Sequence, residues 1–153
     1  MPSPEATPMP HVDRSLLVHY SAEQMFELVA DVEHYPQFLP WCSGSRVVRD
    51  REGGADATVE LDYRGIKSHF TTRNDLRFPE QIRMSLLDGP FRSLTGHWSF
   101  IALRPGACKV QLTLHYEFAS SLLGRALAPV FEHVAHSMIE SFESRAEQVY
   151  GPH

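Results

Sequence analysis

The chain has 153 residues, a formal net charge of −5, and 42% hydrophobic and 22% charged residues. This composition fits one globular domain large enough for a real core, and the negative charge argues against a DNA-binding or other general nucleic-acid-binding protein. No run approaches the roughly 18 apolar residues that a membrane-spanning helix needs. Cys42 and Cys108 have neither metal-site nor redox spacing, which favours two reduced thiols in a cytoplasm.

The first ten residues, MPSPEATPMP, are rich in proline. They have neither the apolar stretch of a signal peptide nor the arginines of a mitochondrial transit peptide. We therefore expect a disordered tail over residues 1–10. The patterned chain that follows predicts a single domain over residues 11–151.

The domain is expected to begin with a strand and a helix. Residues 11–19 alternate apolar and polar side chains, as a strand does. Ser21 suits the N-cap of a helix whose apolar stripe runs to Val32. Pro36 and Pro40 end this helix and allow at most a short further turn.

Between residues 44 and 118 the apolar side chains recur at every second position. The strand-like segments are 45–52, 55–64, 66–77, 80–88, 92–103 and 108–118, and Gly or Pro turn signals separate them. Successive short strands with tight turns predict an antiparallel meander with one apolar and one wet face.

The last element is predicted to be a long helix over residues 121–150, ~45 Å from end to end, which Pro129 should kink or break. The order of elements predicts an α+β fold, in which a seven-stranded curved antiparallel sheet wraps around the C-terminal helix. A curved sheet and one helix touch along a line, so we expect an apolar cavity between them. Residues 35–41 contain Tyr35 and other large apolar side chains, and are expected to close its mouth.

Four short motifs carry a family resemblance. They are YPQFLPWC after the first helix, DGPF at 88–91, HWSF at 97–100 and RAEQVYG at 145–151. Together they resemble the coenzyme Q-binding branch of the START-like superfamily, which includes bacterial ribosome-association toxins and mitochondrial coenzyme Q-binding proteins. The resemblance implies the helix-grip fold and a hydrophobic tunnel for ubiquinone, another polyprenyl quinone or a similar lipid, with no required cofactor. The missing basic targeting segment favours the bacterial form.

The tunnel is expected to be lined from its mouth, the sheet and the last helix. The resemblance points to Phe38, Leu39, Pro40 and Trp41 at the mouth and to Phe91, Trp98 and Phe100 in the sheet. Inward parity and helical spacing add Leu61, Tyr63, Phe70, Leu112, Tyr116, Met138 and Phe142. Trp98 has two readings: its ring could flank a quinone head group with the indole N–H donating to a carbonyl, or it could be a core tryptophan.

Catalytic and metal-binding functions find little support. The superfamily includes polyketide cyclases and aromatases, but the inward positions offer only Tyr63, Tyr116 and Asn74 as polar groups, with no nucleophile and base pair. His133, His136 and Glu140 could share a helix face, yet their order is not that of a zinc protease. We therefore expect a non-enzymatic protein without a metal site.

Two functions remain, with a cyclase-like enzyme as a third alternative. The main hypothesis is a quinone carrier that supports respiration, in a bacterial cytoplasm with peripheral contact to the inner membrane. The rival is a toxin-like inhibitor of ribosome association that binds the large subunit. Both would use cations on the outer face of the sheet, against anionic lipids or rRNA. The expected docking cations are Arg64, Lys67, Arg73, Arg83 and Lys109, interleaved with acidic residues.

Overall fold

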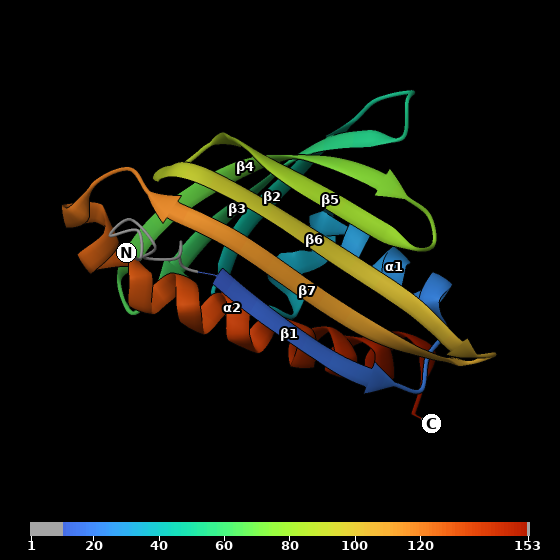
Figure 1. The fold of residues 1–153 in the computed structure, drawn as a ribbon. Coiled ribbons are helices and arrows are strands. Elements are labelled where there is room, and N and C mark those ends of the chain that lie inside the picture. Colours follow the sequence, from blue (N-terminus) through green and yellow to red (C-terminus); the bar gives the residue numbers. More distant parts are fainter. Residues whose placement is uncertain (1–10, 153) are drawn as a thin grey trace, which may run out of the picture.

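The computed structural model describes residues 11–152, and the tail expected over residues 1–10 lies outside this range. The elements are β1 (His11–Val18), α1 (Ala22–Ala30), the 3₁₀ helix η1 (Val32–Gln37), β2 (Cys42–Arg49), β3 (Gly54–Tyr63), β4 (Ile66–Arg77), β5 (Gln81–Asp88), β6 (Phe91–Arg104), β7 (Ala107–Phe118) and α2 (Ser121–Tyr150). Figure 1 shows the sheet curving in front of both α-helices. The expected α+β helix-grip architecture is confirmed.

All seven strands form one antiparallel sheet in the order β1-β7-β6-β5-β4-β3-β2. Strands β2 to β7 are joined by consecutive hairpins, which the turn residues of the sequence predict. Strand β1 pairs with β7 instead, with Val12 opposite Leu114 and Leu16 opposite Val110. The segment that holds α1 and η1 therefore connects the two edges of the sheet across its apolar face.

The caps of both helices follow from the sequence. Ser21 accepts a hydrogen bond from the Gln24 backbone at 3.1 Å, and the Gln24 side chain accepts one from the Ser21 backbone at 2.9 Å. This capping box satisfies two donors that would otherwise lack partners. Ser120 is the N-cap of α2, and its hydroxyl accepts a hydrogen bond from the Leu123 backbone at 3.1 Å.

Helix α2 is unbroken over 30 residues, so the break considered at Pro129 is absent. Proline removes one helical hydrogen bond, but the buried neighbours Leu127 and Val130 hold both sides of it in the core. None of the helices within residues 11–152 is both long and apolar enough to cross a bilayer.

Helix α2 does not cover the apolar face evenly. It packs mainly on β1, β7 and α1, with Phe142 and Ala146 completely buried. Residues of β3, β4 and β5 face η1 and α2 across a cavity. This uneven coverage leaves the space in which the cavity lies.

The apolar stretch after α1 is packed against the rest of the fold. Tyr35, Leu39 and Trp41 are buried, and the Tyr35 hydroxyl donates to the Val29 carbonyl. Ser45 of β2 donates to the Val32 carbonyl at 2.7 Å. The segment is thus tied to α1 and β2 at the same time.

Candidate functional site: an apolar cavity with one polar edge

A cavity of about 60 Å³ lies between the sheet, η1 and α2. Side chains from η1, from every strand between β3 and β7, and from α2 line it. The lining residues are Val32, Tyr35, Ala57, Val59, Phe70, Thr72, Asn74, Met84, Leu94, Gly96, Trp98, Leu112, Leu114, Phe131, Val134, Ala135 and Met138. Nearly all are apolar, so the site suits a hydrophobic ligand.

Two polar side chains on β4 interrupt this lining. Thr72 and Asn74 are both buried, and the Thr72 hydroxyl donates to Asn74 Oδ1 at 2.6 Å. Tyr35 also reaches the cavity, but its hydroxyl is bonded to the Val29 carbonyl. Desolvation by burial raises the pKa of Tyr35 far above its usual value, so its phenol stays neutral.

The structure brings four of the expected ligand-binding residues together around this cavity: Phe70, Trp98, Leu112 and Met138. Leu61 and Phe91 line a second cavity of about 10 Å³, which shares Phe70 and Phe131 with the first. The two cavities are therefore neighbours, separated by aromatic rings.

The other expected residues lie behind the lining or at its edge. Phe38, Leu39, Trp41, Tyr63, Phe100, Tyr116 and Phe142 line neither of these two cavities. Phe142 packs edge-on against Trp98 at 5.5 Å and against Tyr35 at 5.3 Å, and Phe100 packs on Phe26 at 5.5 Å. These rings support the cavity wall from behind without lining the cavity.

Tyr63 and Tyr116 take different places from those expected. Tyr63 lies at the end of β3 and stacks on the exposed His133 of α2, with 4.6 Å between ring centroids. Tyr116 belongs to an aromatic cluster around Phe131, also at 4.6 Å. Neither contributes a polar group to the main cavity.

Phe131, Ala135 and Gly96 line the cavity but were not among the residues predicted to do so. Phe131 belongs to the predicted helix over residues 121–150 and shares the helical spacing of Met138 and Phe142, so a signal for it was present. Gly96 carried a signal too, because glycine inside a strand marks a close approach. A Cβ built at Gly96 would lie 2.4 Å from the Met84 methyl carbon and 2.8 Å from a Leu114 methyl carbon.

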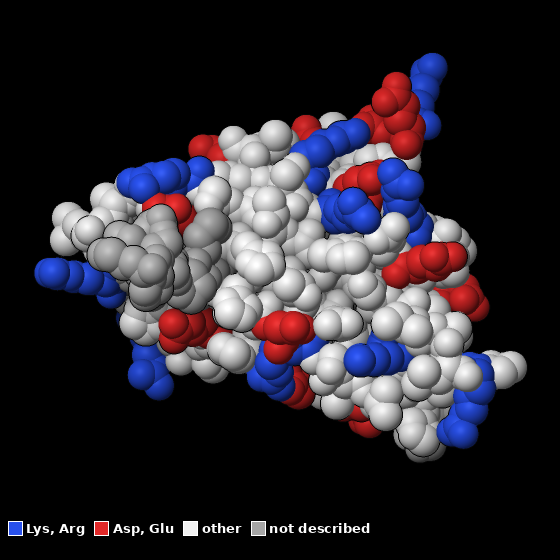
Figure 2. Space-filling view, viewed as in Figure 1, with Lys and Arg blue, Asp and Glu red and all other residues white. Residues whose placement is uncertain are grey.

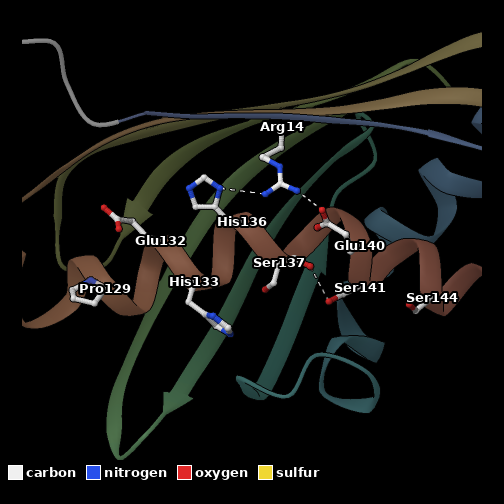
Figure 3. Close-up of a pocket in the computed structure, with 9 residues that line it drawn as sticks. All are labelled: Arg14, Pro129, Glu132, His133, His136, Ser137, Glu140, Ser141 and Ser144. Carbon is white, nitrogen blue, oxygen red and sulfur yellow. Dashed lines mark hydrogen bonds and ion pairs between the residues drawn. The ribbon is translucent and has the colours of Figure 1, made fainter.

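A wide groove on the other side of α2 holds the residues considered for a metal (Figure 3). Arg14 of β1 forms an ion pair with Glu140 and lies 3.4 Å from His136 Nδ1, while His133 points away from them toward Tyr63. Within residues 11–152, no three His, Cys, Asp or Glu side chains converge as metal ligands would. The contacts give Arg14 a structural role that ties β1 to α2.

The expected cationic face is interrupted by acidic partners. Arg73 is paired with Asp50 and Asp56, and Figure 2 shows acidic and basic side chains interspersed over the outer face of the sheet. The outward placement of Arg64 on a strand was wrong: it occupies the β3–β4 turn with φ 52°, and its guanidinium lies 5.3 Å from the Tyr63 ring centroid. A tight hairpin turn needs positive φ, which removes Arg64 from strand parity.

Lys67, Arg83 and Lys109 remain on the outer face as expected. Lys109 is flanked by two exposed apolar side chains, Leu17 and Ile101, in the ladder β1-β7-β6. The three cations are thus spread over different strands and do not form one compact patch.

Both cysteines are buried and free, without a disulfide. Burial raises the pKa of the Cys42 and Cys108 thiols to about 11 each. Both stay protonated at neutral pH, so neither is an activated nucleophile.

An ion pair fastens η1 to the sheet. Arg49 donates two hydrogen bonds to Glu33, at 2.6 and 2.7 Å, and this lowers the pKa of Glu33 from 4.5 to about 2. Since the folded pKa is the lower one, the pair stabilises the fold above pH 4.5, and this contribution is lost as the pH falls through about 2. The side chains are 43% and 48% exposed, which limits the effect to at most about 1 kcal/mol.

We expect Glu33→Gln to lower the free energy of unfolding by up to about 1 kcal/mol at pH 7, and the difference from wild type to vanish by about pH 2. Urea titrations across this range measure it. Glu132→Gln is the control, because Glu132 is exposed and forms no ion pair within residues 11–152. A difference that persists unchanged at about pH 2 would contradict the assignment.

Comparisons with known proteins agree with this architecture. The family model described as polyketide cyclase / dehydrase and lipid transport matches residues 18–143. The chain belongs to this family. Zhui aromatase/cyclase from Streptomyces sp. R1128 has the same fold, with a TM-score of 0.79 at 21% identity over 92% of this chain and 94% of that one.

Two curated relatives come from the branch that the motifs resemble. The ribosome association toxin RatA of Vibrio cholerae is 48% identical over 143 residues, which is 94% of this chain and 99% of RatA. The mitochondrial coenzyme Q-binding protein COQ10 homolog B of Xenopus laevis is 30% identical over 141 residues, which is 90% of this chain and 58% of that protein. The resemblance to the coenzyme Q-binding and ribosome-association branch is thereby confirmed.

Proposed function

We propose that this protein is a non-enzymatic carrier that holds a polyprenyl quinone, such as ubiquinone, between its sheet, η1 and α2. The observation that supports the proposal most is the apolar cavity itself, placed between the sheet, η1 and α2. The 30% identity with a coenzyme Q-binding protein supports the choice of ligand. We place the carrier in a bacterial cytoplasm, in peripheral contact with the inner membrane.

The ligand must widen the cavity to enter. Pockets for ligands of this class measure about 300–1,000 Å³, against about 60 Å³ here. Two features make widening feasible. Met84 is flexible and lies over Gly96, and the rings of Phe70 and Phe131 line both the first cavity and the second. The quinone ring would occupy the main cavity and the tail would pass between these rings.

The chemistry of the lining supports carriage rather than catalysis. Among the described residues that line the cavity there is no carboxylate, imidazole or thiol. General acid–base catalysis needs a titratable group within hydrogen-bonding reach of the reacting atoms. Thr72 and Asn74 can bind and orient a ligand, but neither is a base at neutral pH.

Trp98 provides a direct test, because the chain has only two tryptophans and only Trp98 lines the cavity. The buried Trp41 Nε1 has no hydrogen-bond partner within residues 11–152, so Trp41→Phe removes an unsatisfied donor and is expected to fold. In this variant a short-chain ubiquinone should quench the Trp98 emission in a saturable way. Emission that does not change with added quinone would contradict the carrier proposal.

A second candidate function is association with the large ribosomal subunit. The relatives named ribosome association toxin RatA, 48% identical in Vibrio cholerae, favour it. The proposed contact is the outer face of the sheet through Lys67, Arg83 and Lys109. Since rRNA binding releases counterions, the affinity should fall steeply with salt.

For this candidate we expect Lys67→Glu, Arg83→Glu and Lys109→Glu together to abolish co-sedimentation with large subunits at low salt. The control reverses three other exposed arginines: Arg51 in the β2–β3 turn, Arg104 at the end of β6 and Arg125 in α2. It makes the same change in net charge. Equal co-sedimentation of wild type and both triple variants at every salt concentration would remove this surface from consideration.

A further inference from the structure

We propose that Thr72 and Asn74 form a head-group subsite, in which the Asn74 side-chain amide donates a hydrogen bond to a carbonyl oxygen of the bound ligand. The inference rests on the proposed function and narrows it, because it requires a hydrophobic ligand whose head group carries a carbonyl. A quinone meets this requirement, and a plain hydrocarbon does not.

A hydrogen bond from Thr72 orients the side-chain amide of Asn74. The Thr72 hydroxyl donates to Asn74 Oδ1 at 2.6 Å. This bond turns the oxygen of the Asn74 amide toward Thr72 on the same strand. Asn74 Nδ2 carries two donors, and within residues 11–152 neither makes a hydrogen bond. Among residues 11–152 the fully buried side-chain nitrogen or oxygen without a partner is Trp41 Nε1, so Asn74 Nδ2 keeps accessible surface. Since Asn74 lines the cavity, its N–H groups can donate to an oxygen of a ligand or of water.

The space beside the Asn74 amide is bordered by Met84 of the neighbouring strand. Asn74 pairs with Met84 on β5, and Met84 pairs with Gly96 on β6, so the three lie in one row on the inner face. Gly96 has no side chain, and the end of Met84 fills its place. Movement of this one flexible side chain opens room beside Asn74.

Thr72 and Asn74 differ from the rest of the cavity lining, which is mostly apolar. The remaining polar groups around the cavity are the Tyr35 hydroxyl, which already donates to the Val29 carbonyl, and the indole N–H of Trp98 on β6. Only β4 presents two polar side chains next to each other, so we expect the polar ligand group to bind there. Thr72 and Asn74 set the direction in which the ligand lies, with its head against β4.

The test compares two probes, a short-chain ubiquinone and a prenylbenzene with the same tail and no ring oxygens. We expect Asn74→Leu to weaken ubiquinone binding roughly threefold to tenfold, while prenylbenzene binds as well as before or more tightly. Thr71→Val is the matched control, since Thr71 forms a similar pair with Thr58 at 2.8 Å on the opposite face of the same strand. It should change neither affinity.

Infrared spectroscopy of the wild-type complex gives an independent readout that does not depend on the folding of a variant. A hydrogen bond lowers the stretching frequency of the quinone carbonyl, so at least one carbonyl band should lie below its position in a hydrocarbon solvent. This shift should disappear in Asn74→Leu.

The outcomes separate the subsite from the carrier. If Asn74→Leu weakens both probes equally or neither, or if the bound carbonyl bands are unshifted, the subsite is wrong while the carrier proposal stands. If wild type binds neither probe, both are wrong. Selective loss of ubiquinone binding together with the loss of the band shift supports the subsite.

Discussion

Replacing Trp98 with alanine is expected to lower the free energy of unfolding by about 3–5 kcal/mol, the usual cost of removing a large buried aromatic side chain. Trp98 is only 2% exposed. Its ring stacks with Phe100 at 6.2 Å and meets Phe142 edge-on at 5.5 Å. Since these rings also support α1 and η1, the hole cannot close without moving them. Urea unfolding of wild type and variant measures the loss.

The same variant should also lose ligand binding, because Trp98 forms part of the cavity wall. Trp41→Ala is the matched control: Trp41 is equally buried, at 2% exposure, but does not line the cavity. It should be destabilised by a comparable amount and still bind ubiquinone under conditions where it is folded. A loss of stability below about 1 kcal/mol for Trp98→Ala would contradict its place in the core.

Replacing Ala135 with leucine is expected to weaken ubiquinone binding at least tenfold, about 1.4 kcal/mol. Ala135 is 1% exposed and lies on the side of α2 that faces the cavity. A leucine there fills a space of only about 60 Å³, so the ligand meets side-chain atoms where it would bind. Binding titrations of wild type and variant give the ratio.

Overpacking at Ala135 should cost about 1–3 kcal/mol of stability, which leaves a folded protein in which binding can be measured. Ala126→Leu is the control, because it makes the same change on the same helix at an exposed position. It should leave both stability and affinity close to wild type. Ubiquinone binding of wild-type strength in Ala135→Leu would place the ligand outside this cavity.

Local pattern was enough to predict the secondary structure. Alternation along residues 108–118 predicted strand β7, observed over Ala107–Phe118, and Ser21 was correctly expected to cap α1. These features depend on neighbours within a few residues, where periodicity and capping chemistry act directly. The order of elements then left few ways to bury the apolar faces, which is why the architecture could be predicted as well.

The cavity could be predicted only in outline. The resemblance pointed to both Trp98 and Phe100 as lining residues, and both are buried, but of the two only Trp98 lines the cavity. The difference comes from where α1 and α2 cross the sheet, which depends on packing between distant elements. The prediction that Arg64 lies on a strand was wrong for a local reason. Arg64 adopts a turn conformation, so the strand ends one residue earlier than expected.

The most direct measurement of the central claim is the lipid content of the protein as its native host makes it. Organic extraction of purified wild type and Ala135→Leu, followed by mass spectrometry, identifies any bound quinone and gives its molar ratio to protein. We predict a polyprenyl quinone in wild type and little or none in Ala135→Leu, with both proteins folded. Repeated wild-type preparations that contain no quinone, and bind none on addition, would contradict the account.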